Sequence, residues 1–113
     1  MNFEEQKIAI IEFFQSVSSY YGCKTEISEA IITDIQNFNP KNSTWNLSEF
    51  VLIQSAYRNE GNRFMMEGEK MYYEISAENI VSFSKTGRHK FEFLEQYSEF
   101  VFRQTKIRFF DKY

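Results

Sequence analysis

The sequence is poor in the residues that cross-link a chain or interrupt its regular structure. Its 113 residues include one cysteine, one proline and four glycines. The lone cysteine, Cys23, cannot form a disulfide within the chain, and unpaired thiols are typical of a reducing compartment. The scarcity of glycine and proline predicts a chain that is mostly regular secondary structure.

Long apolar runs are also missing. No segment approaches the roughly 18 uninterrupted apolar residues of a membrane-spanning helix. The first residues have neither the basic start nor the apolar run of a signal peptide. We therefore expect a cytoplasmic protein that makes no contact with a membrane.

Motifs for common catalytic chemistry are absent as well. The sequence has no glycine-rich phosphate loop and no G-x-S-x-G pattern. One histidine and one cysteine cannot supply the four ligands of a structural zinc site. His89 lies in a basic run typical of a solvated loop, and we expect Cys23 to be a small apolar residue in a connection. The sequence therefore predicts no catalytic residues, no metal, no cofactor and no enzymatic activity.

The overall composition is typical of a folded domain. Hydrophobic residues make up 42% of the chain and charged residues 26%, both near the averages of globular proteins. The length is that of one domain, and no repeat, linker or low-complexity tract divides it. We expect a single domain over residues 1–113.

The first half of the chain has helical patterns. Asn2 and Glu5 resemble a capping box, and apolar residues then recur at helical spacing as far as Tyr21. Gly22 is a suitable helix end because glycine enters the left-handed region without strain. A second helix is expected over residues 25–38, where Ile27, Ile31, Ile35 and Phe38 fall on one helical face. Residues 46–57 fit a helix or a buried strand, with the helix preferred.

Short β-prone runs separated by turn signals begin at Arg63. They cover residues 63–66, 70–75, 80–84, 91–94 and 100–110, which is the spacing of an antiparallel meander. A helix through residues 91–101 is the main alternative. In the last strand, alternation places Arg103 and Thr105 on the same side as Ile107. The order of elements predicts an α+β fold, with N-terminal helices packed on a C-terminal antiparallel β-meander of about four to five strands.

Acidic and aromatic residues suggest a surface for a protein partner. The net charge is −3, and carboxylates cluster around the hairpin expected at residues 63–75. Of the neighbours Tyr72 and Tyr73, one must point away from the core because strand side chains alternate. Trp45 lies in a polar loop, either as a lid over the core or as an exposed anchor. The predicted partner-binding residues are Glu67, Glu69, Tyr72, Tyr73, Glu74 and Trp45.

The C-terminal segment suggests a different partner. Residues 1–84 carry six basic and twelve acidic side chains, whereas residues 85–113 carry seven basic and four acidic ones. Basic residues beside aromatic ones on a sheet can bind single-stranded nucleic acid through charge and stacking. The candidates for such binding are Arg88, Lys90, Arg103, Lys106 and Arg108.

Three functions follow as hypotheses. The preferred one is a small acidic protein-binding module, an inhibitor or immunity-type protein that occludes a basic nucleic-acid-handling toxin or enzyme. The alternatives are a single-stranded nucleic-acid binder and a small-ligand-binding domain with a pocket between helices and sheet. A homodimer is also expected, because the phenylalanine-rich strand at residues 100–110 would be exposed to pairing if it formed a sheet edge.

Overall fold

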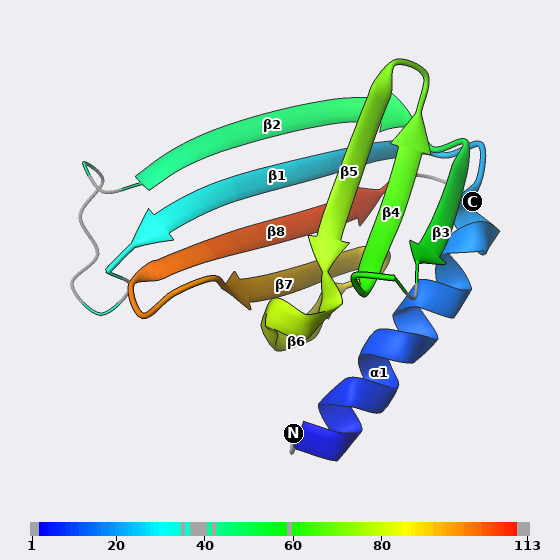
Figure 1. Cartoon of the computed structure of the whole chain (residues 1–113). Helices are drawn as coiled ribbons and strands as arrows, with labels where there is room; N and C mark the ends of the chain where they lie inside the picture. The colour runs from blue at the N-terminus through cyan, green and yellow to red at the C-terminus, as the bar shows by residue number, and fades with distance from the viewer. Residues whose placement is uncertain (1–2, 35, 37–40, 42, 59, 111–113) are drawn as a thin grey trace.

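The computed structural model describes residues 3–34, 36, 41, 43–58 and 60–110, and Phe3 only in its backbone. Within these residues the chain forms one α-helix followed by eight strands (Figure 1). The elements are α1 (Phe3–Ser16), η1 (Val17–Tyr20), β1 (Lys24–Thr33), β2 (Ser43–Val51), β3 (Gln54–Arg58), β4 (Arg63–Gly68), β5 (Met71–Ser76), η4 (Ala77–Asn79), β6 (Ile80–Gly87), β7 (Lys90–Gln96) and β8 (Val101–Phe109).

The strands form two antiparallel sheets. The larger sheet has the order β2-β1-β8-β7-β6, and the smaller has the order β3-β4-β5. Leu52 and Ile53 join them: Leu52 N–H donates to the Cys23 carbonyl at 3.0 Å, and Ile53 N–H donates to the Glu67 carbonyl at 2.8 Å. The smaller sheet crosses in front of one end of the larger, and α1 lies beside it (Figure 1). The architecture is thus α+β, with one helix packed against two antiparallel sheets.

The helix predicted at residues 25–38 is wrong, because residues 24–33 form β1. Ile27 and Ile31 are four residues apart, and that spacing satisfies a helical stripe and a strand's alternation equally well. The chain's β-branched residues here favour the strand, which is flanked on both sides by partners, β2 and β8. Ile35 and Phe38 lie outside the described residues.

The preference for a helix at residues 46–57 is also wrong. This stretch is β2, a short link and β3. The first helix is confirmed over Phe3–Ser16, and the chain leaves η1 through Gly22 with a φ of 90°. Asn2, one half of the expected capping box, lies outside the described residues. All five C-terminal strands are found, and the helical alternative for residues 91–101 is wrong.

The strand count and the sheet edges differ from the prediction. The predicted meander of four to five strands is only partly matched, because β4 and β5 belong to the smaller sheet and β6, β7 and β8 to the larger, and β1, β2 and β3 were not part of the predicted meander. The predicted edge at residues 100–110 is not an edge, because β8 pairs with β1 on one side and β7 on the other. The edge-strand reason for expecting a homodimer therefore does not apply.

The core lies where the two sheets and α1 meet. Phe13 of the helix is 3% exposed, and its ring packs against Phe91 at 4.6 Å and Phe93 at 5.2 Å between centroids. Phe64 of the smaller sheet contacts it at 6.0 Å. One ring thus connects the helix to both sheets.

Gly68 lies where the smaller sheet comes close to β2. A Cβ atom at this position would lie 2.7 Å from the Phe50 ring and 3.0 Å from the Val51 carbonyl oxygen. The absence of a side chain therefore allows the end of β4 to pack against β2.

Candidate functional site

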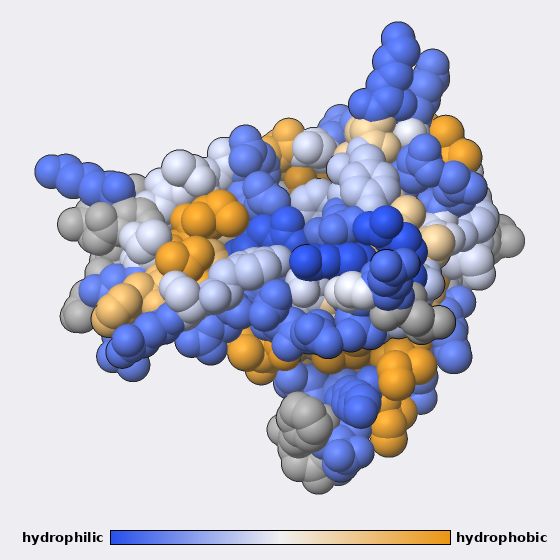
Figure 2. Space-filling view, in the orientation of Figure 1, coloured by the Kyte–Doolittle hydropathy of each residue, from blue (hydrophilic) through white to orange (hydrophobic). Residues whose placement is uncertain are grey.

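A groove runs between α1 and the strands that face it. It has a volume of about 810 Å³ and is open to solvent along one side. We call it the helix groove. Figure 2 shows hydrophobic surface on the helix and where the helix joins the body. The groove is lined by Gln6, Lys7, Ile10, Ile11, Phe14, Gln15, Ser18, Tyr21, Ser55, Ala56, Tyr57, Asn62, Phe64, Ala77, Glu78 and Ile80.

Two neighbouring stripes of α1 have different environments, and the groove lies along one of them. Phe13 and Val17 are buried in the core, while Phe14 and Ile11 line the groove on the neighbouring stripe. Phe14 stacks on Phe64 with centroids 4.2 Å apart and an interplanar angle of 11°. The groove therefore has an aromatic wall fixed by core packing.

Hydrogen-bonded polar groups lie in the lining of the helix groove. The hydroxyl of Tyr21, which follows η1, lies 2.8 Å from Oγ of Ser55 on β3 and accepts from the Ser55 N–H at 2.7 Å. Elsewhere in the lining, the Tyr57 hydroxyl donates to Asn62 Oδ1 at 3.1 Å, and the Asn62 amide donates to Glu78. These bonds fix side chains around an apolar interior.

The helix groove has the character of a binding site. Among the described residues that line it, the charged side chains are Lys7 and Glu78, and no histidine or cysteine is present. No group of three or more metal-ligating side chains occurs among the described residues. The arrangement offers apolar surface and a few hydrogen-bonding groups, which can hold and orient a ligand.

A second polar feature lies between the two sheets. The Glu95 carboxylate of β7 is fully buried, and Arg103 of β8 donates to it from Nε at 2.9 Å and from Nη2 at 3.0 Å. Glu95 also accepts from the Ser76 N–H of β5 at 3.0 Å, and Arg103 Nη1 lies 3.4 Å from Glu29 of β1. We call these four residues the inter-sheet cluster. They join the small sheet to the large one.

Two tyrosines lie next to the inter-sheet cluster. The Tyr73 hydroxyl lies 2.6 Å from Thr105 Oγ1, and burial raises the Tyr73 pKa well above its usual value. The Tyr97 hydroxyl donates to Glu95, and burial together with that carboxylate raises the pKa of Tyr97 to about 12. Both tyrosines stay protonated hydrogen-bonding groups, as a structural role requires.

The predicted partner-binding residues do not form one surface. Glu67, Tyr72 and Glu74 share the outward face of the small sheet, with Glu69 in the turn beyond it. Tyr73 points inward, so the prediction that only one of the two neighbouring tyrosines faces the core is confirmed. Trp45 is not in a loop but on β2, 65% exposed on a different sheet.

Basic side chains offset the carboxylates on the small sheet. Glu74 pairs with Arg58 at 2.9 Å and with Arg63 at 3.5 Å. A hydrogen bond from Tyr72, with the two arginines, lowers the pKa of Glu74. The lowered pKa favours the ionised form of Glu74, and the charges of Arg58 and Arg63 offset that carboxylate.

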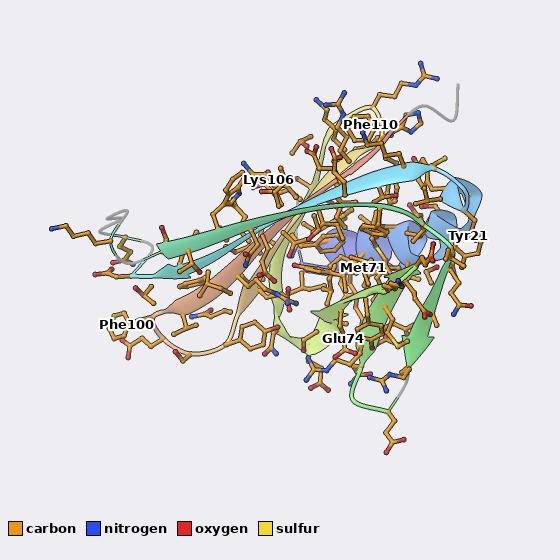
Figure 3. All side chains as sticks on the ribbon, turned by 90° about the horizontal axis from the view of Figure 1, so that it is seen from above. Tyr21, Met71, Glu74, Phe100, Lys106 and Phe110 are labelled. Carbon is orange, nitrogen blue, oxygen red and sulfur yellow. The ribbon has the colours of Figure 1, made fainter. Side chains whose placement is uncertain are left out.

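The predicted basic residues divide between two environments. Lys90, Lys106 and Arg108 occupy the outward face of the large sheet, and Arg88 lies in the turn before β7. Arg103 belongs to the inter-sheet cluster instead. Figure 3 shows Lys106 and Glu74 on opposite sides of the molecule.

His89 and Cys23 have structural environments. His89 lies in the turn between β6 and β7 with a φ of 62°. It is only half-buried, but its Nδ1 lies 2.8 Å from the Tyr20 hydroxyl, so it ties the turn to η1 rather than extending freely into solvent. Cys23 is a buried free thiol in the connection before β1, as expected.

A pocket between helices and sheet was one of the hypotheses from the sequence, but no residue was assigned to it. Ile11, which lines the helix groove and is 46% exposed, is an apolar position outside the buried stripe of α1, and it was the available signal. In the described part of the chain no helix is long and apolar enough to cross a membrane.

Comparison with known protein families, curated proteins and solved structures gives no match.

Proposed function

We propose that the protein is a non-catalytic binding module that holds a small, largely apolar ligand in the helix groove. The supporting observation is the groove itself, because its volume of about 810 Å³ is typical of ligand sites, which span about 300–1,000 Å³. Its lining combines apolar walls with a few hydrogen-bonding groups, a pattern that favours recognition by shape.

Burial of exposed apolar surface supplies the binding energy. Ile11 is 46% exposed and Tyr57 is 42% exposed, and a ligand seated between them would remove both from water. Each 100 Å² of apolar surface removed from water is worth about 2.5 kcal/mol before the entropic costs of association. An apolar ligand therefore gains more here than a polar one of the same size.

Nile red, a neutral apolar dye, is the probe for this proposal. We expect its fluorescence to rise on binding, and Ile11→Glu to weaken its affinity about tenfold because a carboxylate replaces part of the apolar wall. The matched control is Ile8→Glu on the same helix, since Ile8 is 55% exposed and is not part of the lining. Circular dichroism checks that both variants are folded. Equal affinity for the two variants, or no saturable binding by the wild type, would contradict the proposal.

The occlusion of a basic protein partner is a second proposal, supported by the outward face of the small sheet. Tyr72 is 50% exposed there, beside Glu67 and Glu74, and exposed tyrosines are enriched where proteins bind one another. Arg58 and Arg63 pair with Glu74 and offset its negative charge, so the exposed Tyr72 supports this proposal more strongly than the carboxylates do.

Charge reversal tests the occlusion proposal. Substituting Glu67, Glu69 and Glu74 together by lysine is expected to slow association with a basic partner at least tenfold at low salt, because like charges then meet during encounter. The measurement is the association rate of any basic protein captured by the wild type. An unchanged association rate at low salt would count against occlusion by this face.

A further inference from the structure

Trp45 lies among basic side chains on the outward face of the large sheet, which its place in the sequence does not suggest. It pairs in register with Ala30 of β1, and its neighbour two positions on, Leu47, pairs with Ser28. Ser28 in turn pairs with Lys106 of β8. Because alternate residues of a strand share a face, Trp45 and Lys106 lie on the same side of the sheet.

The indole ring is held in place rather than free to rotate. Trp45 Nε1 donates to Ser28 Oγ at 2.6 Å, which fixes one edge of the ring over β1. The side chain is nevertheless 65% exposed. A fixed aromatic surface facing solvent loses little entropy when a second ring stacks on it.

Cations continue along this face from the tryptophan. Arg108 lies two positions beyond Lys106 on β8, and Lys90 is directly opposite Arg108 on β7. In the part of the chain that the structure describes, none of these three cations forms an ion pair with a carboxylate. A shallow hollow of about 420 Å³ is lined by Trp45, Leu47 and all three cations.

Carboxylates on the same face offset only part of this charge. Glu49 is paired with Lys24 at 3.5 Å. Glu92 is opposite Lys106, and Glu26, which also lines the hollow, is opposite Arg108. With Arg88 in the adjacent turn, the cations of this face still outnumber its carboxylates, in a chain whose net charge is −3.

We propose that this face binds single-stranded nucleic acid, with a base stacked on Trp45 and phosphates held by Lys106, Arg108 and Lys90. Every base has a ring face that can stack on an aromatic side chain, and cations beside such a ring track the backbone. A duplex keeps its bases stacked on one another, so the site selects single strands. The site is independent of the helix groove.

The chain's single tryptophan is also the reporter for the experiment. We expect oligothymidylate to quench Trp45 fluorescence saturably at low salt. The logarithm of affinity should fall with the logarithm of salt concentration with a slope of about −2, at about −0.7 for each of three phosphate contacts. A duplex of the same length should bind more weakly.

Variants separate the contribution of stacking on Trp45 from that of the cations. The readout is the fluorescence anisotropy of a labelled oligonucleotide. Trp45→Ala should weaken binding about 5- to 150-fold, the range of a lost stacking contact. Lys106→Gln with Arg108→Gln should lower the salt slope by about 1.4. The controls are Tyr72→Ala and Lys70→Gln on the small sheet, which should bind as the wild type does.

Three results would overturn the inference. They are the absence of quenching at low salt, equal affinity of Trp45→Ala and the wild type, and a preference for duplex over single strands. Binding of heparin as tight as that of oligothymidylate, with no effect of Trp45→Ala, would show a site for polyanions in general and would equally contradict it.

Discussion

Replacing Arg103 by methionine is expected to lower the free energy of unfolding by about 3–5 kcal/mol, the usual cost of breaking a buried ion pair from one side. The variant would leave the Glu95 carboxylate, which is 0% exposed, without its counter-charge. The remaining donors, the Ser76 N–H and the Tyr97 hydroxyl, are neutral groups and cannot replace a guanidinium that donates two bonds.

The reciprocal change is expected to cost less. Glu95→Gln keeps an acceptor for the Ser76 N–H, and Arg103 keeps Glu29 at 3.4 Å as a second carboxylate. Combining Glu95→Gln with Arg103→Met removes both charges, so the double variant should be more stable than Arg103→Met alone. Urea denaturation followed by circular dichroism measures all three differences in free energy.

Arg58→Met is the matched control for Arg103→Met. Arg58 also pairs with a glutamate, Glu74 at 2.9 Å, but its side chain is 56% exposed. Surface ion pairs contribute about 0–1 kcal/mol, so this variant should unfold near the wild type. A loss below about 1 kcal/mol for Arg103→Met as well would show that the inter-sheet cluster is not desolvated, and the contrast between the two arginines would disappear.

The inter-sheet cluster shows what strand alternation can and cannot predict. Alternation placed Arg103 and Thr105 on the same side of the last strand as Ile107, and in the structure that side faces the core. The same residue was nevertheless assigned to a nucleic-acid surface, because its buried partner Glu95 is opposite it only once β7 and β8 are in register. The register between two strands cannot be predicted from the alternation pattern of one strand alone.

The predicted helix at residues 25–38 failed for a different reason. A spacing of four residues, as between Ile27 and Ile31, fits both a helical repeat of 3.6 and a strand repeat of 2. The C-terminal strands were easier to predict, because Phe91 and Phe93 alternate with Glu92 and such alternation is the pattern of a strand with one buried face. Glycine and asparagine turns between the strands then fixed their ends.

The surfaces were harder to predict than the elements. Trp45, expected as either a lid over the core or an exposed anchor, was grouped with the residues of the acidic hairpin as a partner-binding residue. Its neighbours in space are instead Ser28 and Lys106. The helix groove forms because the strands do not cover the second apolar stripe of α1, which includes Ile11 and Phe14. Neither relation follows from local sequence, because each requires the position of β2 or β3 relative to elements far along the chain.

Phe13→Ala is the second substitution with a large expected effect, a loss of about 3–5 kcal/mol in the free energy of unfolding. Phe13 is 3% exposed, and its ring contacts Phe83 of β6 as well as phenylalanines of β4 and β7. Truncation would leave a cavity that no single neighbour can fill, since the surrounding rings belong to three strands fixed by their own hydrogen bonds.

Ile8→Ala is the control for Phe13→Ala on the same helix. Ile8 is 55% exposed, and alanine has a higher helix propensity than isoleucine, so its substitution should change stability by less than about 1 kcal/mol. Thermal or urea unfolding monitored by circular dichroism separates the two variants. Similar losses at both positions would mean that α1 is held by its whole surface rather than through the Phe13 ring.

The Phe13 substitution also links stability to the helix groove. Phe14, on the adjacent stripe, stacks on Phe64 at 4.2 Å and forms the aromatic wall, and this contact depends on α1 staying against the sheets. If Phe13 anchors the helix, Phe13→Ala should weaken Nile red binding even under conditions where the protein remains folded, whereas Ile8→Ala should not. Loss of stability with unchanged dye affinity would show that the Phe13 ring does not position the part of α1 that lines the groove.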